Sequence, residues 1–262
     1  MLFGMPTLIE EESLTGCAAL CGELGLSFIE LNMNLPAYQP GRIKVKTLRA
    51  IAETYGLDFT IHMDENLNPF DFNPLVARAY QATLLRTIDL AQQLNVSVIN
   101  LHLCPGVWFT LPQQKVFLYE KYEKIYRSNV REFRSLCQQA VGENGPLLCL
   151  ENTNWQAASF LQRTVDMLLE SPIFALTYDV GHDFVAGGQD GMFIIERKDR
   201  IGHIHLHDAL PDSDHLPLGT GQVDISRTLS LADKAGCRVV LETKTTAALK
   251  QSVAYLHSHD YL

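Results

Sequence analysis

The chain has 262 residues, of which 47% are hydrophobic and 19% charged, so it carries enough apolar material for a large core and no compositional sign of disorder. Its formal net charge of −9 gives no overall field that would draw it to nucleic acid or to an anionic membrane. No apolar run approaches the roughly 18 residues of a membrane helix, and the N-terminal stretch MLFGMPTLIEEES lacks the basic start of a secretion signal.

These bounds predict a cytoplasmic protein without a membrane partner, and they disfavour a nucleic-acid partner without excluding one. The six cysteines form no C-x-x-C pair, which favours reduced thiols. Cys17 and Cys21 are four residues apart, as on one face of a helix, and we expect them to pack as small hydrophobic residues. Assembly into a homo-oligomer stays open.

Short apolar runs alternate along the chain with longer segments of helical spacing. In the segment 46–56, apolar residues recur at helical intervals up to Gly56, a plausible residue for a helix C-terminus, and the segment 78–95 has the same character. The runs predicted as strands are residues 2–5, 28–33, 58–63, 97–103, 146–152, 174–180, 201–207 and 237–243.

Eight strands that alternate with helices indicate an α/β protein with a parallel sheet of βα units. The units average about 33 residues, the scale of a βα repeat, and no stretch resembles an interdomain linker. We therefore expect one domain over residues 1–262, folded as a (β/α)8 TIM barrel. The active site is then expected in the loops at the carboxyl ends of the strands, and the longest irregular stretches (64–74, 104–112 and 208–224) each follow a predicted strand.

Polar residues occupy the last inward positions of most of these strands. Unpaired carboxylates that converge at one rim of a barrel would repel one another, and a cation would relieve that repulsion. The predicted rim residues are Glu30, His62, His102, Glu151, Asp179, His205 and Glu242.

The stretch DRIGHIHLHDAL (199–210) places three histidines on one face of a predicted strand. Alternate residues lie about 6.6 Å apart, whereas a metal–nitrogen bond is about 2.0–2.1 Å long, so neighbouring histidines seldom share an ion. Register against Asp179 and Glu242 puts His205 at the rim. His203 would then lie a layer lower, as a core or supporting residue. His207 and Asp208 would begin the next loop, either as substrate contacts or as solvated groups.

Several motifs together resemble the xylose isomerase-like TIM barrel superfamily, which includes a sugar phosphate isomerase/epimerase group and an endonuclease IV group. The resemblance covers essentially the whole chain, and the HLPLGTG loop after the HxHxxD strand is its most specific part. The motifs are LEN with Glu151, YDVGH with Asp179 and His182, HIHLHD with His205, HLPLGTGQVD (215–224), and LET with Glu242.

The resemblance implies one divalent metal ion held by Glu151, Asp179, His205 and Glu242. Three carboxylates and one imidazole form an oxygen-rich set that suits Mn²⁺, our first expectation, or Mg²⁺ or Co²⁺, with Zn²⁺ as a further candidate. The implied enzyme is an isomerase or epimerase of a small keto-sugar. Glu151 or Glu242 would remove the proton α to the carbonyl, and the other would return a proton to the enediolate.

The residues expected to bind the substrate surround this set. His182 resembles the substrate-contacting histidine of the family. Trp155, like Trp108 and Phe109, could wall the pocket or pack in the interior, and Lys244 could bind an anionic substrate or be solvated. The full predicted set is His182, His62, His102, His215, Trp155 and Lys244.

Three rival functions share parts of this pattern. A dehydratase would form the same enolate and expel a β-hydroxyl group. An abasic-site endonuclease would use His62, His102, His182 and His215 to hold further zinc ions, but Ser213 stands where that group has an aspartate, and Asp214 replaces an arginine common to both groups. A non-catalytic barrel would lack one of the metal ligands, whereas this sequence has a suitable residue at all four ligand positions. The stretch AGGQDG (186–191) is expected to form a flexible loop that enters the sixth helix, because it is too weak a signal for a phosphate cradle.

Overall fold

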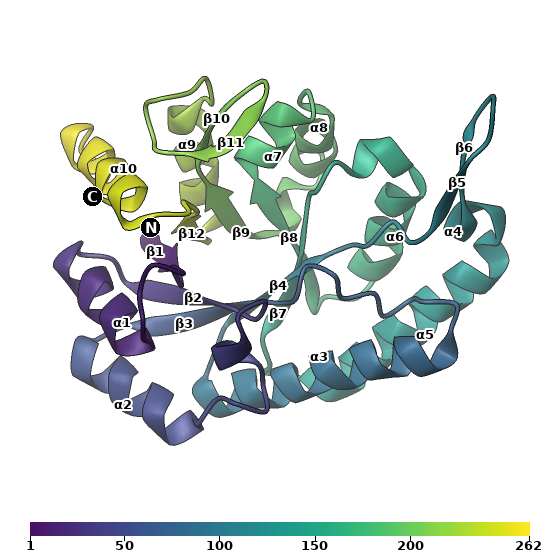
Figure 1. Cartoon of the computed structure of the whole chain (residues 1–262), viewed down its shortest axis with the longest axis horizontal. Helices are drawn as coiled ribbons and strands as arrows, with labels where there is room; N and C mark the ends of the chain where they lie inside the picture. Colours follow the sequence, from purple (N-terminus) through teal and green to yellow (C-terminus); the bar gives the residue numbers. More distant parts are fainter.

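The computed structural model describes all residues, 1–262, and shows eight parallel strands closed into a barrel (Figure 1). The order around the barrel is β1-β12-β9-β8-β7-β4-β3-β2, so the first strand pairs with the last. Each strand matches a predicted one to within two residues at either end, and the (β/α)8 fold is confirmed. The strands are β1 (Leu2–Pro6), β2 (Phe28–Asn32), β3 (Asp58–His62), β4 (Val98–His102), β7 (Leu147–Glu151), β8 (Phe174–Asp179), β9 (Ile201–Leu206) and β12 (Arg238–Leu241).

Helices surround the barrel, and none of them is both long and apolar enough to cross a bilayer. The predicted helix 46–56 is α2 (Val45–Tyr55), which ends at Gly56 with φ 65°. The predicted helix 78–95 is α3, but it begins earlier, at Pro74, because Asn73 caps it by accepting the Leu75 N–H. The remaining elements are α1 (Leu14–Glu23), α4 (Leu118–Lys121), α5 (Glu123–Val141), α6 (Phe160–Leu169), α7 (Val180–Val185), α8 (Gln189–Ile195), α9 (Ile225–Ala235), α10 (Thr246–Ser258) and the 3₁₀ turns η1 (Pro36–Tyr38), η2 (Trp155–Ala158) and η3 (Lys198–Arg200).

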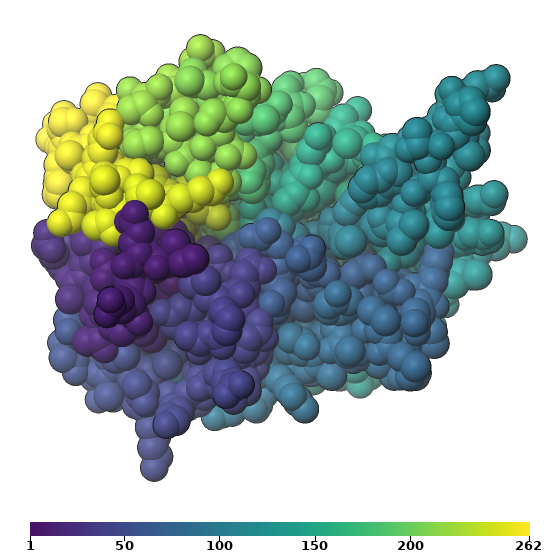
Figure 2. All heavy atoms as spheres, viewed as in Figure 1, coloured from purple at the N-terminus to yellow at the C-terminus, as the bar shows by residue number.

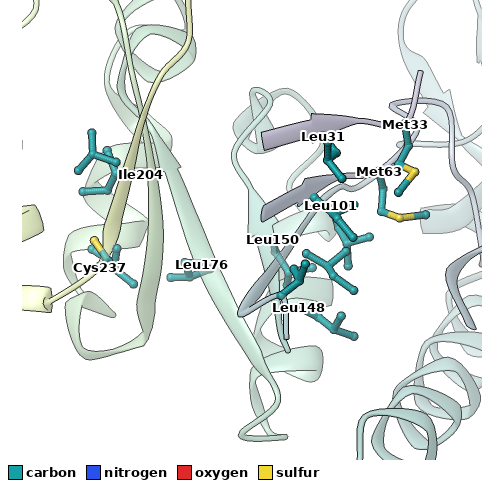
Figure 3. Packing of buried hydrophobic residues seen from close by; sticks show 14 of the residues in the cluster. Leu31, Met33, Met63, Leu101, Leu148, Leu150, Leu176, Ile204 and Cys237 are labelled. Carbon is teal, nitrogen blue, oxygen red and sulfur yellow. The ribbon is translucent and has the colours of Figure 1, made fainter. Parts of the chain in front are cut away.

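Side-chain alternation along the strands separates an apolar outer face of the barrel from a polar interior. Leu31, Leu101, Leu150 and other outward side chains are buried in the main hydrophobic cluster, which Figure 3 shows between strands and helices. Towards the carboxyl ends of the strands the inward residues are polar and buried, whereas Val98, Cys149 and Ala175 form a small apolar layer below them. Thr177 donates a hydrogen bond across the barrel to Asn100 at 2.6 Å. Hydrogen-bonded polar groups of this kind lie directly below the rim and support it.

Two hairpins were not predicted. The stretch 104–112 contains β5 (Trp108–Thr110), which pairs with β6 (Lys115–Phe117), and this hairpin stands clear of the body (Figures 1 and 2). Trp108 and Phe109 are 45% and 57% exposed there, so they neither wall a pocket nor pack in the interior. The second hairpin, β10 (Asp208–Leu210) with β11 (Ser213–Leu216), lies beyond β9 in a stretch also expected to be irregular.

The glycine-rich loop after β11 winds around the carboxylate of Asp208. This side chain is 1% exposed and accepts N–H groups from Ala209, Gly219, Gly221 and Val223 at 2.8–3.0 Å. The expectation that Asp208 contacts substrate or is solvated is wrong, because its oxygens are used by the loop. A Cβ at Gly221 would lie 2.4 Å from the carbonyl oxygen of Ala209, so the LGTG sequence lets the loop approach this closely.

This close approach predicts that Gly221→Ala lowers the free energy of unfolding by about 1–3 kcal/mol, since the new methyl group meets rigid backbone. Urea unfolding of the purified protein measures the change. The matched control is Gly22→Ala in α1, where nothing lies within 4 Å of the added atom. An unchanged free energy for Gly221→Ala would contradict the described loop packing.

Candidate active site

Four side chains from four strands meet at the carboxyl end of the barrel. Glu151 and Asp179 end β7 and β8, His205 lies on β9, and Glu242 directly follows β12. Each offers one potential ligand atom, and these atoms all lie within 4.8 Å of one another. Glu151, Asp179 and His205 are 0% exposed, and 18% of the Glu242 side chain is exposed. The structure thus brings together the four residues expected to bind a metal ion.

The arrangement of these atoms fits a cation better than it fits direct hydrogen bonds. His205 Nδ1 lies 2.9 Å from Glu242 Oε2, 3.4 Å from Glu151 Oε2 and 3.8 Å from Asp179 Oδ2. Despite these distances, His205 Nδ1, Glu242 Oε2 and Glu151 Oε1 are buried without a hydrogen-bond partner. Buried polar atoms without partners are costly, and a divalent ion between them would satisfy several at once.

The other nitrogen of His205 faces Glu30, which lies below the rim and not at it as predicted. His205 Nε2 is 3.0 Å from Glu30 Oε1, and Glu30 Oε2 also contacts His203 Nε2 at 3.1 Å and accepts a hydrogen bond from Thr60. Burial would raise the pKa of Glu30, but the positive charge of His205 and hydrogen bonds from both histidines hold it well below its usual range. A carboxylate behind Nε2 favours a proton there and leaves Nδ1 free to bind a metal. His203 is the supporting residue that was predicted.

Three histidines surround the Glu151 carboxylate. His62 Nε2 and His102 Nε2 lie 3.3 and 3.0 Å from Oε2, and His182 Nδ1 lies 3.2 Å from Oε1. His215 lies on the far side of the site, with Nε2 3.9 Å from Glu242 Oε1. The four histidines expected to bind substrate therefore all reach the rim. Three of them contact Glu151, and the fourth faces Glu242.

A pocket of about 380 Å³ opens above this site, a size within the usual range for small ligands. Most of its lining groups can hydrogen-bond to hydroxyl groups, and the charged side chain among them, Asp214, is acidic. The lining residues are His102, Thr153, Asn154, His182, Val185, Ala186 and Asp214.

Of the other residues expected to bind substrate, Trp155 does not line the pocket and Lys244 lies at its edge. Trp155 is 0% exposed and packs edge-on against Phe193, so of its two expected roles interior packing is confirmed and the pocket wall is wrong. Its backbone N–H donates to the buried carboxylate of Asp190, in the AGGQDG stretch, which turns between α7 and α8 and is anchored there. The side chain of Lys244 is 72% exposed, and Nζ lies 3.9 Å from Asp214 Oδ1 at the edge of the site.

Sequence reasoning missed the residues that hold the ligand set in place. Asn152 clamps the backbone of Asp179, donating to its carbonyl and accepting from its N–H, both at 2.8 Å. Asn100 donates to Glu151 Oε2. His207 is 0% exposed and contacts Asp179 Oδ1 at 3.0 Å, so it is neither solvated nor in the pocket. The asparagine of the LEN motif was a visible signal, because a buried amide beside a strand end needs partners.

Comparison with known proteins finds the same barrel fold in other chains. "Uncharacterized protein MJ1311" of Methanocaldococcus jannaschii is 25% identical over 250 residues, which cover 90% of this chain and 80% of the relative. Among solved structures, a D-tagatose 3-epimerase-like protein matches with a TM-score of 0.77 and 20% identity, over 100% of this chain and 98% of the other. The 3-keto-D-glucoside 4-epimerase of E. coli matches with a TM-score of 0.75 and 16% identity, over 98% and 99%.

A D-psicose 3-epimerase from Clostridium cellulolyticum matches with a TM-score of 0.72 and 16% identity, over 100% of this chain and 99% of the other. At these identities the likeness establishes a shared fold. Residues 18–259, most of the chain, match the family model described as a xylose isomerase-like TIM barrel. The protein therefore belongs to the xylose isomerase-like TIM barrel family.

Proposed function

We propose that the protein is a divalent-metal-dependent isomerase or epimerase of a small keto-sugar or related polyol carbonyl compound. The observation that carries the proposal is the convergence of ligand atoms from Glu151, Asp179, His205 and Glu242 within 4.8 Å, several of them buried and unpartnered. A bound divalent ion would supply the positive charge that stabilises an oxygen anion next to a carbon losing its proton. Mn²⁺ is the ion we propose, because the set is rich in carboxylates.

Two glutamates are placed to move the proton. Glu151 and Glu242 come from β7 and the end of β12, which two other strands separate around the barrel, so they approach the space between them from different directions. One carboxylate would take the proton α to the carbonyl, and its bonding electrons would form the enediolate double bond. The other carboxylate would return a proton to the opposite face, giving an epimer, or to the adjacent carbon, giving an isomer.

The pocket supports a substrate rich in hydroxyl groups. His182 lines it, with 21% of its side chain exposed, and Nδ1 lies 3.2 Å from Glu151 Oε1, so a bound substrate would meet this histidine beside the base. The epimerase names among the structures that share the fold support the same class of reaction. The cytoplasmic location and a homo-oligomeric state remain predictions.

One observation favours a second candidate function. His62 and His102 both face Glu151 Oε2, which is the kind of cluster that could hold another ion for an abasic-site endonuclease. Against this, the exposed Ser213 offers no carboxylate at the position where that group has one, and the chain carries a net charge of −9. A dehydratase would share the first proton transfer, so only its product distinguishes it.

Metal binding must compete with protons on the site's histidines. Burial disfavours the charged form of His62, but a hydrogen bond and the charge of Glu151 outweigh it and raise the pKa to about 9. Burial likewise opposes the charge on His182, yet Asp179 and Glu151 raise the pKa to about 10. In the metal-free protein, these protons neutralise the carboxylates that an ion would otherwise neutralise.

These pKa shifts predict how stability depends on pH without metal. A group whose pKa is raised by folding stabilises fully below its unfolded value, here 6.5, and loses that contribution as the pH rises through about 9–10. The melting temperature of the metal-free protein should therefore fall between pH 6.5 and 9, by at least ~3 °C, which corresponds to about 1 kcal/mol at this size. The stabilisation that Mn²⁺ adds should grow over the same range.

Calorimetry on chelator-treated protein at pH 6.5 and 9, with and without Mn²⁺, measures both changes. His62→Gln is the control, since it removes one of the titrating groups and should flatten the metal-free profile. A metal-free melting temperature that stays level or rises towards pH 9 would contradict the assignment of protons to the histidines.

Hydrogen exchange tests the proposed chemistry directly. In deuterated water with Mn²⁺, the protein should place deuterium on the carbon next to the carbonyl of at least one ketose among D-fructose, D-tagatose and D-psicose. Glu151→Gln or Glu242→Gln should slow this exchange by about 10²–10⁴-fold, since each removes a general base. Mass spectrometry of the recovered sugar provides the measurement, and Glu53→Gln, an exposed glutamate of α2, is the matched control.

The same preparations separate the candidate functions. If no ketose in the panel exchanges and the metal-loaded protein instead cleaves duplex DNA at an abasic site, the endonuclease assignment replaces this one. Loss of a β-hydroxyl group from the substrate would identify a dehydratase.

A further inference from the structure

His207 is a buried histidine that the proposed chemistry leaves without a role. It stands between β9 and β10, its side chain is 0% exposed, and it is absent from the pocket lining. Its ring stacks on that of His215, with centroids 4.3 Å apart and planes 5° apart. His207 therefore lies outside the pocket and packs against the hairpin β10–β11 through His215.

The hairpin backbone determines which nitrogen of His207 carries the proton. The N–H of His215 donates to Nδ1 at 2.8 Å, so Nδ1 must be an acceptor. A longer contact of 3.3 Å joins Nδ1 to the carbonyl oxygen of Asp208, but two acceptors cannot share a bond without a proton between them. The proton then resides on Nε2, which lies 3.0 Å from Asp179 Oδ1 and donates to it.

This bond completes the coordination of one oxygen of Asp179. Oδ1 also accepts the backbone N–H of His182 at 2.7 Å, so two donors hold it. Oδ2 is turned towards His182 Nδ1 at 3.3 Å and His205 Nδ1 at 3.8 Å, on the side of the predicted metal ligands. His207 Nε2 also lies 3.2 Å from Oδ2, so the ring contacts the whole carboxylate edge.

A glycine makes room for this ring. A Cβ at Gly181 would lie 2.0 Å from Cε1 and 2.2 Å from Nδ1 of His207, a distance that no side chain tolerates without moving the ring. Gly181 lies in α7, and nothing else in its helical conformation demands glycine. The sequence YDVGH thus contains three parts of this arrangement. Asp179 supplies the carboxylate, Gly181 leaves space for the His207 ring, and the His182 N–H is the second donor to Asp179 Oδ1.

We propose that His207 is a positioning residue for Asp179, and that through the His215 N–H the hairpin β10–β11 sets the affinity of the site for its metal ion. The inference rests on the proposed function in one respect, because it requires Asp179 to be a metal ligand. His207 does not line the pocket. Among the four candidate ligands it contacts Asp179.

The test is Mn²⁺ titration of the metal-free full chain by calorimetry. His207→Phe fills the space without a donor and should weaken Mn²⁺ binding by about 10–100-fold, the usual cost of losing a partner of a metal ligand. His207→Gln can place an amide N–H where Nε2 lies and should stay within about threefold of the parent chain, whereas His207→Asn, whose amide ends near Nδ1, should not. Gly181→Ala should weaken binding like His207→Phe, although His207 is intact.

Three controls keep a structural effect apart from positioning. Gly22→Ala is the matched glycine substitution and should bind Mn²⁺ like the parent. Metal-free melting temperatures identify any variant that is unfolded. If His207→Phe does not fold, Mn²⁺ binding is compared between the parent, His207→Asn and Gly181→Ala. At saturating Mn²⁺, kcat for deuterium exchange should return to within a few-fold of the parent, because His207 does not touch the substrate.

The outcomes are distinct for the two proposals. If the parent binds Mn²⁺ and the folded His207 and Gly181 variants bind it equally well, the positioning role is overturned while the proposed function stands. If the parent binds no divalent ion at all, both are overturned. Rescue by His207→Gln but not by His207→Asn, together with the Gly181→Ala loss, supports the role of the Nε2 donor.

Discussion

Buried negative charge at one end of the barrel is the constraint on which the rest of the structure depends. Glu151, Asp179 and Glu242 point at a common space, and carboxylates removed from water repel one another strongly unless positive charge lies between them. Two sources of that charge are available. Protons on the surrounding histidines provide it in the metal-free protein, and a divalent ion would provide it in the loaded one. The same side chains therefore serve stability in one state and chemistry in the other.

Buried polar groups next to the rim hold three of the four candidate ligands: Glu151, Asp179 and His205. Glu30 stands behind His205, and Asn100 donates a hydrogen bond to Glu151. Asp179 is held at both its backbone and its carboxylate. These partners account for the polar interior of a barrel whose outer face is apolar (Figure 3). A ligand set with fixed geometry needs such support, since a freely rotating carboxylate would not select one ion.

The alternation of apolar runs and helical segments predicted most of the fold, and the polar residues at the strand ends, with the family motifs, indicated the four candidate ligands. It could not give the depth of Glu30, because neighbouring barrel strands are staggered: Glu30 pairs with Thr60, and the next inward pair is Asn32 with His62. Hairpins of three or four residues per strand were also missed, since such short runs show no period. For Trp155, residue type left a pocket wall and interior packing both open, and the structure shows packing. For Asp208, residue type suggested a substrate contact or a solvated group, whereas hydrogen bonds from the following loop bury it.

The most direct test of the account is to locate the ion. Crystals soaked in Mn²⁺ and measured on both sides of the manganese absorption edge should show an anomalous peak within about 2.0–2.6 Å of ligand atoms from Glu151, Asp179, His205 and Glu242. Density only at surface carboxylates, with none between those four side chains, would contradict the central claim.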